Sequence, residues 1–301
     1  MAANIIHHTT ITGMHAHLGF EPPTHPLITI IDMNRMANGP EEVGNKITNE
    51  FYSVALKDKG CGLDYGRNHY DFDEGALIFM APGQVLTLTR EVRLGQIDGW
   101  LLYFHPDLIR GTSLGERIDS YHFFSYDVHE ALHLSRQEED TINQCVDLLK
   151  TEISSRIDQH SQTVLASTLE LILNHAKRFY ERQFITRRPQ NQDLLSKVER
   201  LLKNYYQAGL MEELGMPSIP YLAEQCNVST YYLSDLLKKE TGRTAKDHIN
   251  DFLIHRAKHL LLGSQDSVSQ IAYSLGFNYP HYFSRLFKAK TGMSPQEFRA
   301  A

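Results

Sequence analysis

Apolar residues recur at helical spacing throughout the C-terminal third of the chain. Between Val268 and Ser294 they fall into two runs separated by Gly276, with Val268, Ile271, Ala272 and Leu275 in the first and Phe283, Leu286 and Phe287 in the second. Such spacing predicts two short amphipathic helices, and glycine suits the sharp turn between them because it lacks a Cβ atom. Pro280 is expected in the first turn of the second helix, with Asn278 as its cap, and Gly292 is expected to end it.

The outer face of the second predicted helix is polar and partly cationic. It carries His281, Ser284, Arg285 and Lys288, at i, i+3, i+4 and i+7. A buried helix followed by a helix with such a face is the helix-turn-helix arrangement, whose second helix enters the major groove of DNA. One pair of this kind is more often simple packing with a solvated outer face, so a single copy does not establish DNA binding.

The same plan occurs a second time, from Ile219 to Thr244. Leu222-Ala223 corresponds to Ile271-Ala272, Asn227-Val228 to Gly276-Phe277, Leu233, Leu236 and Leu237 to Phe283, Leu286 and Phe287, and Thr241-Gly242 to Thr291-Gly292. Matched positions of the two copies are 49 residues apart up to the expected caps, Ser229 and Asn278. After the caps they are 50 residues apart. On the outer face, Tyr231, Ser234, Asp235 and Lys238 correspond to His281, Ser284, Arg285 and Lys288.

A connecting helix is predicted between the two copies, from Thr244 to Leu262, with Thr244 as its cap and Gly263 as its stop. Its apolar stripe consists of Ile249, Phe252, Leu253, Ala257, Leu260 and Leu261. At 1.5 Å per residue it spans roughly 28 Å, and successive major-groove faces are about 34 Å apart. A helix of this length can hold two recognition helices on one side of a DNA duplex.

The run from Ser267 to Arg299, SVSQIAYSLGFNYPHYFSRLFKAKTGMSPQEFR, closely resembles the C-terminal signature of the AraC/XylS family of bacterial transcription regulators. The first copy and the connecting helix resemble the rest of that family's DNA-binding domain, so the resemblance covers about the last hundred residues. It implies that each recognition helix enters the major groove and that a variable N-terminal domain senses a signal.

Candidate DNA contacts follow from the resemblance, position by position. The candidates for base edges are Tyr231, Ser234, His281, Ser284 and Arg285, and those for phosphates are Ser229, Lys238, Asn278 and Lys288. Arginine pairs with guanine through two hydrogen bonds worth about 1–3 kcal/mol of discrimination, whereas phosphate contacts fix the register. Asp235 departs from the pattern, because it stands where Arg285 stands in the second copy; it either weakens the first recognition helix or specifies its target through cytosine.

The charge of the chain is divided unevenly. The net charge of the chain is −6. From Leu194 onward there are 13 Lys and Arg and 10 Asp and Glu, so the net charge is +3 there and −9 in the preceding part. This asymmetry directs attraction for DNA to the C-terminal part. Its small size predicts weak, salt-sensitive non-specific binding.

The N-terminal part reads as β structure from Leu27 to about Phe104. The clearest expected strands are 27–32, 50–57, 76–80, 85–89 and 99–104. Many short strands predict a barrel or a sandwich, and LIFMAPGQ and LLYFHPDLI resemble the cupin-like barrel that often precedes this DNA-binding domain. The expected fold class is therefore α+β with two domains: a cupin-like β-barrel with flanking helices, then an all-α domain with two helix-turn-helix motifs joined by a linker helix.

Two helices are expected after the barrel. Ser135 and Glu138 predict a capping box for a helix near 136–156, and a second helix is expected from about 162 to 183. By resemblance such helices serve as dimer contacts in part of the family, while packing within one chain is equally open. The polar run RRPQNQ predicts a linker. The expected domains are 1–186 for sensing and dimerisation (barrel about 20–110, helices about 135–185), a linker at 187–193, and a DNA-binding domain at 194–301.

Little in the sequence favours catalysis. His15-Ala-His17 is the only HxH pair and lies ahead of the barrel without a convincing set of partners, so neither a metal nor another cofactor is expected. No GxSxG, P-loop or GxGxxG motif occurs in a strand–turn–helix context. The alternative kept open is a metal-dependent cupin enzyme fused to a DNA-binding domain. Tyr52, Tyr65, Tyr70, Phe72, Trp100 and Tyr103 are candidates for lining an effector cavity, although the core is the commoner place for such residues.

The remaining features bound the class of protein. There is no run of eighteen apolar residues and no secretory signal, which predicts no membrane span, and Cys61, Cys145 and Cys226 are too scattered for a disulfide framework or a zinc site. The prediction is a cytoplasmic, sequence-specific DNA-binding transcription regulator, most simply an activator. Its expected partners are double-stranded DNA, a small effector of unknown identity or a protein contact at the N-terminal domain, RNA polymerase if it activates, and a second copy if it dimerises.

Overall fold

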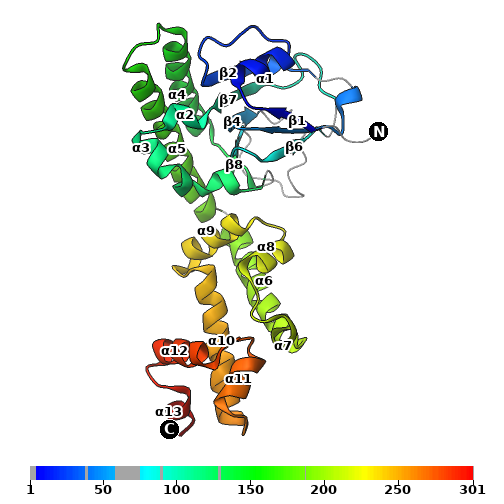
Figure 1. Cartoon of the computed structure of the whole chain (residues 1–301), viewed down its shortest axis with the longest axis vertical. Coiled ribbons are helices and arrows are strands. Elements are labelled where there is room, and N and C mark those ends of the chain that lie inside the picture. Colours follow the sequence, from blue (N-terminus) through cyan, green and yellow to red (C-terminus); the bar gives the residue numbers. More distant parts are fainter. Residues whose placement is uncertain are drawn as a thin grey trace. The chain divides into compact units, whose positions relative to one another are not determined.

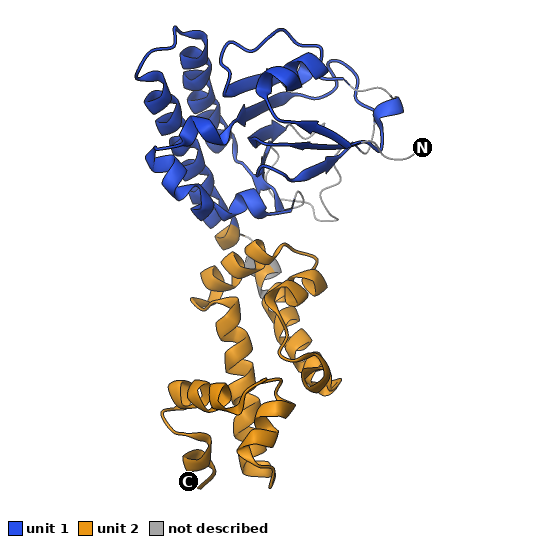
Figure 2. Cartoon of the chain, in the orientation of Figure 1, with its two compact units in different colours: residues 1–183 blue, residues 184–301 orange. Residues whose placement is uncertain are grey.

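A computed structural model describes residues 5–37, 40–57, 75–88, 91–127, 130–186 and 188–300 (Figure 1). The chain divides into two compact units, Met1–Gln183 and Phe184–Ala301 (Figure 2). Within the described ranges, no helix combines the length and the apolar content needed to cross a membrane.

The first unit contains two sheets. The larger has the order β2 (Ile28–Asp32), β7 (Gly99–Phe104), β4 (Tyr52–Lys57), β5 (Ala76–Met80) and β8 (Leu132–His133), and the smaller has the order β1 (Ile5–His8), β3 (Lys46–Asn49) and β6 (Val85–Thr87). The five strands predicted from the sequence are confirmed as β2, β4, β5, β6 and β7. All pairs in the larger sheet are antiparallel, whereas β1 and β3 are parallel.

The expected cupin-like barrel is not confirmed. Over the described residues, β3 pairs with β1 and β6 only, and the edge strands β2 and β8 of the larger sheet pair with neither β1 nor β6. The two sheets therefore stay separate and do not close on each other. What the structure shows is a sheet-rich N-terminal region with flanking helices, in a chain that is mostly helical.

The larger sheet buries both of its faces. Trp100, Leu102 and Phe104 alternate with Leu101 and Tyr103 along β7. On one face Trp100 donates from Nε1 to Oδ1 of Asn143 on α4 (Arg136–Ser154), at 2.9 Å. On the other, Leu101 and Tyr103 pack against a cluster built by Ile11 and Met14 of α1 (Ile11–His17) with Ile31 and Phe51. The helix α1 thus covers the face of the sheet that carries Leu101 and Tyr103.

The two helices predicted after the sheets are confirmed as α4 and α5 (Ser161–Thr186). The predicted capping box is present, because Oγ of Ser135 accepts from the Glu138 amide while the Glu138 carboxylate accepts from the Ser135 amide. Glu138 also binds Arg182 near the end of α5, at 2.6 Å, so the two helices run antiparallel. The short helices α2 (Pro106–Ile109) and α3 (Ser113–Arg117) precede them.

The aromatic residues proposed to line an effector cavity do not all occupy the same kind of position. Tyr52 stacks on Phe104 with ring centroids 5.1 Å apart, and Trp100 is buried against α4, so both belong to the core. Tyr103 packs edge-on against Phe51, and burial raises the pKa of its hydroxyl to about 12. Tyr65, Tyr70 and Phe72 lie outside the described residues.

The described residues of the second unit form helices and the turns between them. Its elements are α6 (Arg188–Gln207), α7 (Leu210–Leu214), α8 (Ile219–Cys226), α9 (Thr230–Thr241), α10 (Ala245–Gly263), α11 (Val268–Ser274), α12 (Pro280–Thr291) and α13 (Pro295–Ala300). Two helix-turn-helix motifs, α8–α9 and α11–α12, are joined by α10, as the sequence predicted. One continuous apolar cluster contains Leu222 and Leu233 of the first motif, Leu253 of α10, and Ile271 and Phe283 of the second.

The described part of the predicted linker, 187–193, belongs to a helix, and its role as a linker between the domains stays a prediction. The helix α6 begins at Arg188, which is compatible with Pro189 because proline is tolerated in a first turn. Asn191 is only 3% exposed, and its amide donates to the Phe184 carbonyl at 2.6 Å and to the Glu240 carboxylate at 2.9 Å. This one polar residue of the segment is therefore buried and hydrogen-bonded.

Candidate nucleic-acid interface

The turns of the two motifs share one geometry. The first turn passes through Asn227, which adopts the left-handed conformation at φ 57°, and the second passes through Gly276 at φ 81°. In each turn the following amide closes back on the preceding helix: Val228 donates to Ala223 at 3.1 Å, and Phe277 donates to Ala272 at 3.0 Å. The predicted correspondence of Asn227-Val228 with Gly276-Phe277 is confirmed.

The predicted cap of the second recognition helix is wrong. The residue at the N-cap of α12 is Tyr279, whose side chain makes no capping bond, and Asn278 lies one position earlier. The cause is Pro280, because a proline forces the preceding residue into an extended conformation, and Tyr279 has φ −136° and ψ 117°. Asn278 is therefore the additional residue of the second copy, and Ser229 corresponds to Tyr279.

With the caps aligned in this way, the candidate contact residues occupy equal positions on the two helices. Counted from the caps Ser229 and Tyr279, the pairs Tyr231/His281, Ser234/Ser284, Asp235/Arg285 and Lys238/Lys288 coincide. Both helices also end alike, at Gly242 with φ 71° and Gly292 with φ 83°. The duplication thus extends from the turn to the end of each recognition helix.

The first recognition helix, α9, presents a limited polar face. Tyr231 is 50% exposed and Lys238 is exposed, while Ser234 and Asp235 are half-buried. The Ser234 hydroxyl donates to the Thr230 carbonyl of its own helix at 2.8 Å, and Oγ of Ser229 accepts from the Tyr232 amide at 3.2 Å as the helix cap. These two hydroxyls are therefore tied to the local backbone, and Tyr231 and Lys238 extend furthest toward solvent.

The second recognition helix, α12, presents a cluster of rings and one cation. The His281 ring lies 4.5 Å from that of Tyr282 and 5.6 Å from that of Tyr279, and the guanidinium carbon of Arg285 lies 5.0 Å from the Tyr282 centroid. Tyr279 is 59% exposed and Tyr282 is 49% exposed. Sequence reasoning missed both tyrosines, although their i, i+3 spacing, continued by Arg285, was a signal available from the sequence.

The phosphate candidates of the second copy lie at the two ends of α12. Asn278 is exposed just ahead of the helix, whose N-terminus carries a partial positive charge, and Lys288 is exposed in its last turn. Lys290, only two residues further on, is also exposed but is paired with α10: its Nζ lies 2.9 Å from Asp251 and 3.3 Å from Asp247. Cations that look alike in the sequence therefore have different surroundings.

The two histidines of the HxH pair have different surroundings, because His15 is buried and His17 is exposed. Nδ1 of His15 lies 2.7 Å from the Glu21 carbonyl, and its Nε2 lies 2.9 Å from the Thr29 hydroxyl. The His17 ring contacts His8, with centroids 5.1 Å apart. Over the ranges that the structure describes, no three His, Cys, Asp or Glu side chains are arranged to hold a metal ion.

Comparisons with known proteins agree with this geometry. A family model described as a helix-turn-helix domain matches residues 222–301. The HTH-type transcriptional activator RhaS of Escherichia fergusonii (strain ATCC 35469) is 40% identical over 78 residues, which are 26% of this chain and only 28% of that relative. RhaS of Escherichia coli (strain SMS-3-5) is 25% identical over 264 residues, which cover 82% of this chain and 92% of that protein.

Two solved structures are also similar to part of the chain. The C-terminal domain of AraT, a response regulator from Geobacillus stearothermophilus, has 30% identity and a TM-score of 0.30, and the match covers 35% of this chain and 84% of that one. A transcriptional regulator with an AraC-type DNA-binding domain from Chromobacterium violaceum has 24% identity and a TM-score of 0.31, over 37% and 94%. From the duplicated motif, the match of the helix-turn-helix family model and the RhaS relatives together, the C-terminal part of this chain is an AraC-type helix-turn-helix domain, as found in DNA-binding transcription regulators.

Proposed function

We propose that the protein is a transcription activator whose two recognition helices, α9 and α12, read two adjacent major-groove segments of double-stranded DNA. One observation carries this proposal: the two helices present side chains at the same positions from their caps, on motifs that share one core with α10. A single helix-turn-helix pair is often mere packing, but a repeat of cap, outer face and end is expected where both copies do the same work.

The length of α10 supports reading of two segments. Its 19 residues span about 28 Å at 1.5 Å per residue, which is close to the roughly 34 Å between successive major-groove faces on one side of a duplex. A capping box between Thr244 and Asp247 defines its start, and its buried face contributes to the common core. α10 is thus suited to act as a stiff spacer.

The roles proposed for side chains differ between the helices. Arg285 is placed to recognise guanine, with His281 and Ser284 as weaker readers of base edges, and Lys288 and Asn278 as phosphate contacts. On α9, Tyr231 is the main candidate for apolar contact with a thymine methyl group or a sugar, and Ser234 contributes a weaker hydrogen bond. Lys238 and the capped helix start at Ser229 contact phosphates. Since Asp235 is half-buried where α12 has an arginine, α12 contributes more to affinity.

Selection of bound DNA from a random pool tests the proposal. Two conserved segments about one helical turn apart are expected in the selected sequences. One compact pair of segments would support binding by the two recognition helices of one chain. Two such pairs would support binding by a dimer. If the full chain enriches no sequence at physiological salt, the proposed function is wrong.

A second part of the proposal is control by a small effector at the N-terminal unit. A recess of about 280 Å³ lies between α1, residues 20–24, β2 and the end of α4, and four of its lining side chains are charged: Glu21, Asp32, Arg35 and Lys150. Ligand pockets are usually about 300–1,000 Å³, so the recess fits a small, polar metabolite. A thermal-shift screen of sugars and small acids tests this, because a true effector stabilises the protein that binds it.

Two protein partners are proposed as well. Leu148 of α4 and Val164 and Leu171 of α5 are 60%, 44% and 43% exposed, and covering these side chains in a homodimer removes apolar surface from water. Sedimentation of the wild type and of Leu148→Asp checks this, and a monomeric wild type would contradict it.

If the protein activates transcription, RNA polymerase in the cytoplasm is the further partner. Transcription in vitro from a template with the selected site shows whether the protein activates or represses.

A further inference from the structure

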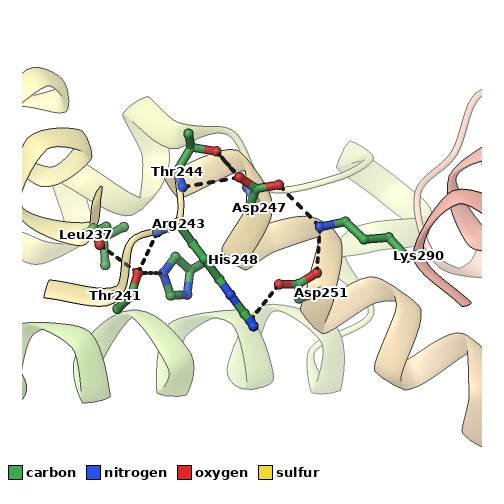
Figure 3. A network of polar contacts seen from close by, with 8 residues as sticks. All are labelled: Leu237, Thr241, Arg243, Thr244, Asp247, His248, Asp251 and Lys290. Atoms are coloured by element: carbon green, nitrogen blue, oxygen red, sulfur yellow. Dashed lines mark hydrogen bonds and ion pairs between the residues drawn. The ribbon is translucent and has the colours of Figure 1, made fainter. Parts of the chain in front are cut away.

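The C-terminal ends of the two recognition helices are bound to the same part of α10 (Figure 3). Lys290, the next-to-last residue of α12, has its Nζ 2.9 Å from Oδ1 of Asp251 and 3.3 Å from Oδ1 of Asp247. Arg243 follows Gly242, the C-cap of α9, and places Nη1 3.0 Å from Oδ2 of Asp251. The two oxygens of the Asp251 carboxylate therefore accept from cations that belong to different helix-turn-helix motifs.

Neighbouring bonds hold these groups in place. Asp247 belongs to the capping box of α10, and its Oδ2 accepts from the Thr244 hydroxyl at 2.7 Å and from the Thr244 amide at 3.2 Å. The Thr241 hydroxyl, in the last turn of α9, lies 2.9 Å from Nε2 of His248 on α10. The Thr244 and Lys290 hydrogen bonds keep the pKa of Asp247 below its ordinary value, and the Asp251 hydrogen bond raises the pKa of Lys290, so Asp247 and Lys290 are both charged at neutral pH.

The second motif also approaches the segment that leads into the first motif. Gly276, in the turn of the second motif, approaches the segment that follows α7 so closely that a Cβ atom on it would lie 2.6 Å from the Met216 amide nitrogen and 2.7 Å from the Gly215 carbonyl carbon. The close approach of Gly276 fixes the turn that precedes α12. The ion pairs of Lys290 fix the other end of the same helix. Two separate contacts restrict rotation of one recognition helix relative to the other more than the shared helix α10 does alone.

We propose that Asp251, supported by Asp247, is a positioning residue that locks α9 and α12 in one relative orientation and thereby makes DNA binding depend on the spacing of the two segments. This inference rests on the proposed reading of two segments. Lys290 then serves geometry and not phosphate binding. Because its partners are themselves partly exposed, loss of the ion pairs costs little folding stability, so the fold survives while the orientation loosens.

The test uses the full chain, the selected two-segment DNA, and the same DNA with one base pair inserted or deleted between the segments. One base pair changes the separation by about 3.4 Å and the rotation by about 35°. Wild type is expected to lose most of its affinity on insertion or deletion. Lys290→Met and Asp251→Asn are expected to reduce that discrimination at least about fivefold, while affinity for DNA with a single segment changes less than about twofold.

Control variants separate the network from its surroundings. Lys290→Arg keeps the charge and is expected to retain discrimination by spacing. Lys246→Met removes an exposed lysine from the same turn of α10 and is expected to behave like wild type. Combining Lys290→Met with Asp251→Asn should have a smaller effect than the sum of the two changes, since both remove the pair between Lys290 and Asp251.

Two outcomes overturn the inference. Wild-type discrimination in both Lys290→Met and Asp251→Asn would show that the ion pairs do not position the helices, even though the protein reads two segments. A wild-type protein that selects only one segment, or none, would overturn the proposed function and this inference with it.

Discussion

The guanidinium carbon of Arg285 lies 5.0 Å from the centroid of the Tyr282 ring, one turn earlier on α12. Stacking of this kind is a favourable cation–π contact, and it restricts the many rotamers of an exposed arginine. A side chain that is already ordered loses less conformational entropy when it binds. In the role that we propose for Arg285, this order would favour the two parallel hydrogen bonds that guanine accepts in the major groove.

Replacement of Arg285 by alanine is expected to weaken binding to the selected DNA by about 10- to 100-fold, because a bidentate contact is worth about 1–3 kcal/mol. Arg285→Lys keeps the charge, so its affinity should lie between those of wild type and Arg285→Ala. Tyr282→Phe keeps the ring and should bind like wild type. Fluorescence anisotropy at physiological salt measures this. Wild-type affinity in the alanine variant would remove Arg285 from the base contacts.

Lys288 and Lys290 form a matched pair for salt dependence. Lys288 is exposed and proposed to contact phosphate, so Lys288→Ala should lower the slope of log affinity against log salt by about one. Lys290 binds Asp251 and Asp247, so Lys290→Ala should leave the slope unchanged. Titrations of the selected DNA at several salt concentrations compare the two, and equal slopes for both variants would mean that the proposed division of roles is wrong.

Gly276→Ala is expected to destabilise the second unit by about 2 kcal/mol or more, because alanine is strained at φ 81° and its Cβ would collide with backbone atoms of residues 215 and 216. Gly292→Ala is the control: its φ is 83°, but no heavy atom lies within 4 Å of an added Cβ. It should cost only the conformational strain, about 1 kcal/mol. Hydrogen exchange of amides in α10 measures both, and equal losses would show that the close approach at Gly276 contributes nothing.

The DNA-binding unit was largely predictable because local rules decide its helices. Apolar residues at helical spacing, Gly276 at the turn and Gly292 at the end fix the second motif, and the repeat confirmed the first. The cap was mispredicted since asparagine is a good cap in general, whereas Pro280 constrained Tyr279 directly. The pairing of Lys290 with Asp247, 43 residues away, depends on how the helices pack, and no local pattern reports it.

The N-terminal unit was harder to predict, because its pairings are not local. The strand β1 has four residues, and its partner β3 begins at Lys46 in a parallel pair; neither is long enough to show alternation. The burial of Asn191 could not be predicted for a related reason. Polarity alone suggested solvent exposure for Asn191, and only the folded chain brings the Phe184 carbonyl and the Glu240 carboxylate to it.

The stability of the N-terminal unit is expected to rise with pH between about 5 and 7. His8 and His25 are buried, at 8% and 7% exposure, and burial lowers the pKa of both below the ordinary value of 6.5, with His17 and His7 lowering that of His8 further. In the unfolded chain these rings take up protons near pH 6.5, before the folded ones do. The unfolded state therefore binds more protons in this window, so that acidification favours unfolding.

His25 offers a direct check on this cause. Its Nδ1 accepts from the Leu27 amide at 3.1 Å, which requires that nitrogen to be unprotonated. Asparagine places an amide oxygen near the same position but does not titrate, so His25→Asn should flatten the dependence of the melting temperature on pH while largely preserving the fold at pH 7.5. Calorimetry of the full chain from pH 5 to 8 measures both proteins, and a wild-type transition that moves to lower temperature as the pH rises through 6 would contradict the assigned sign.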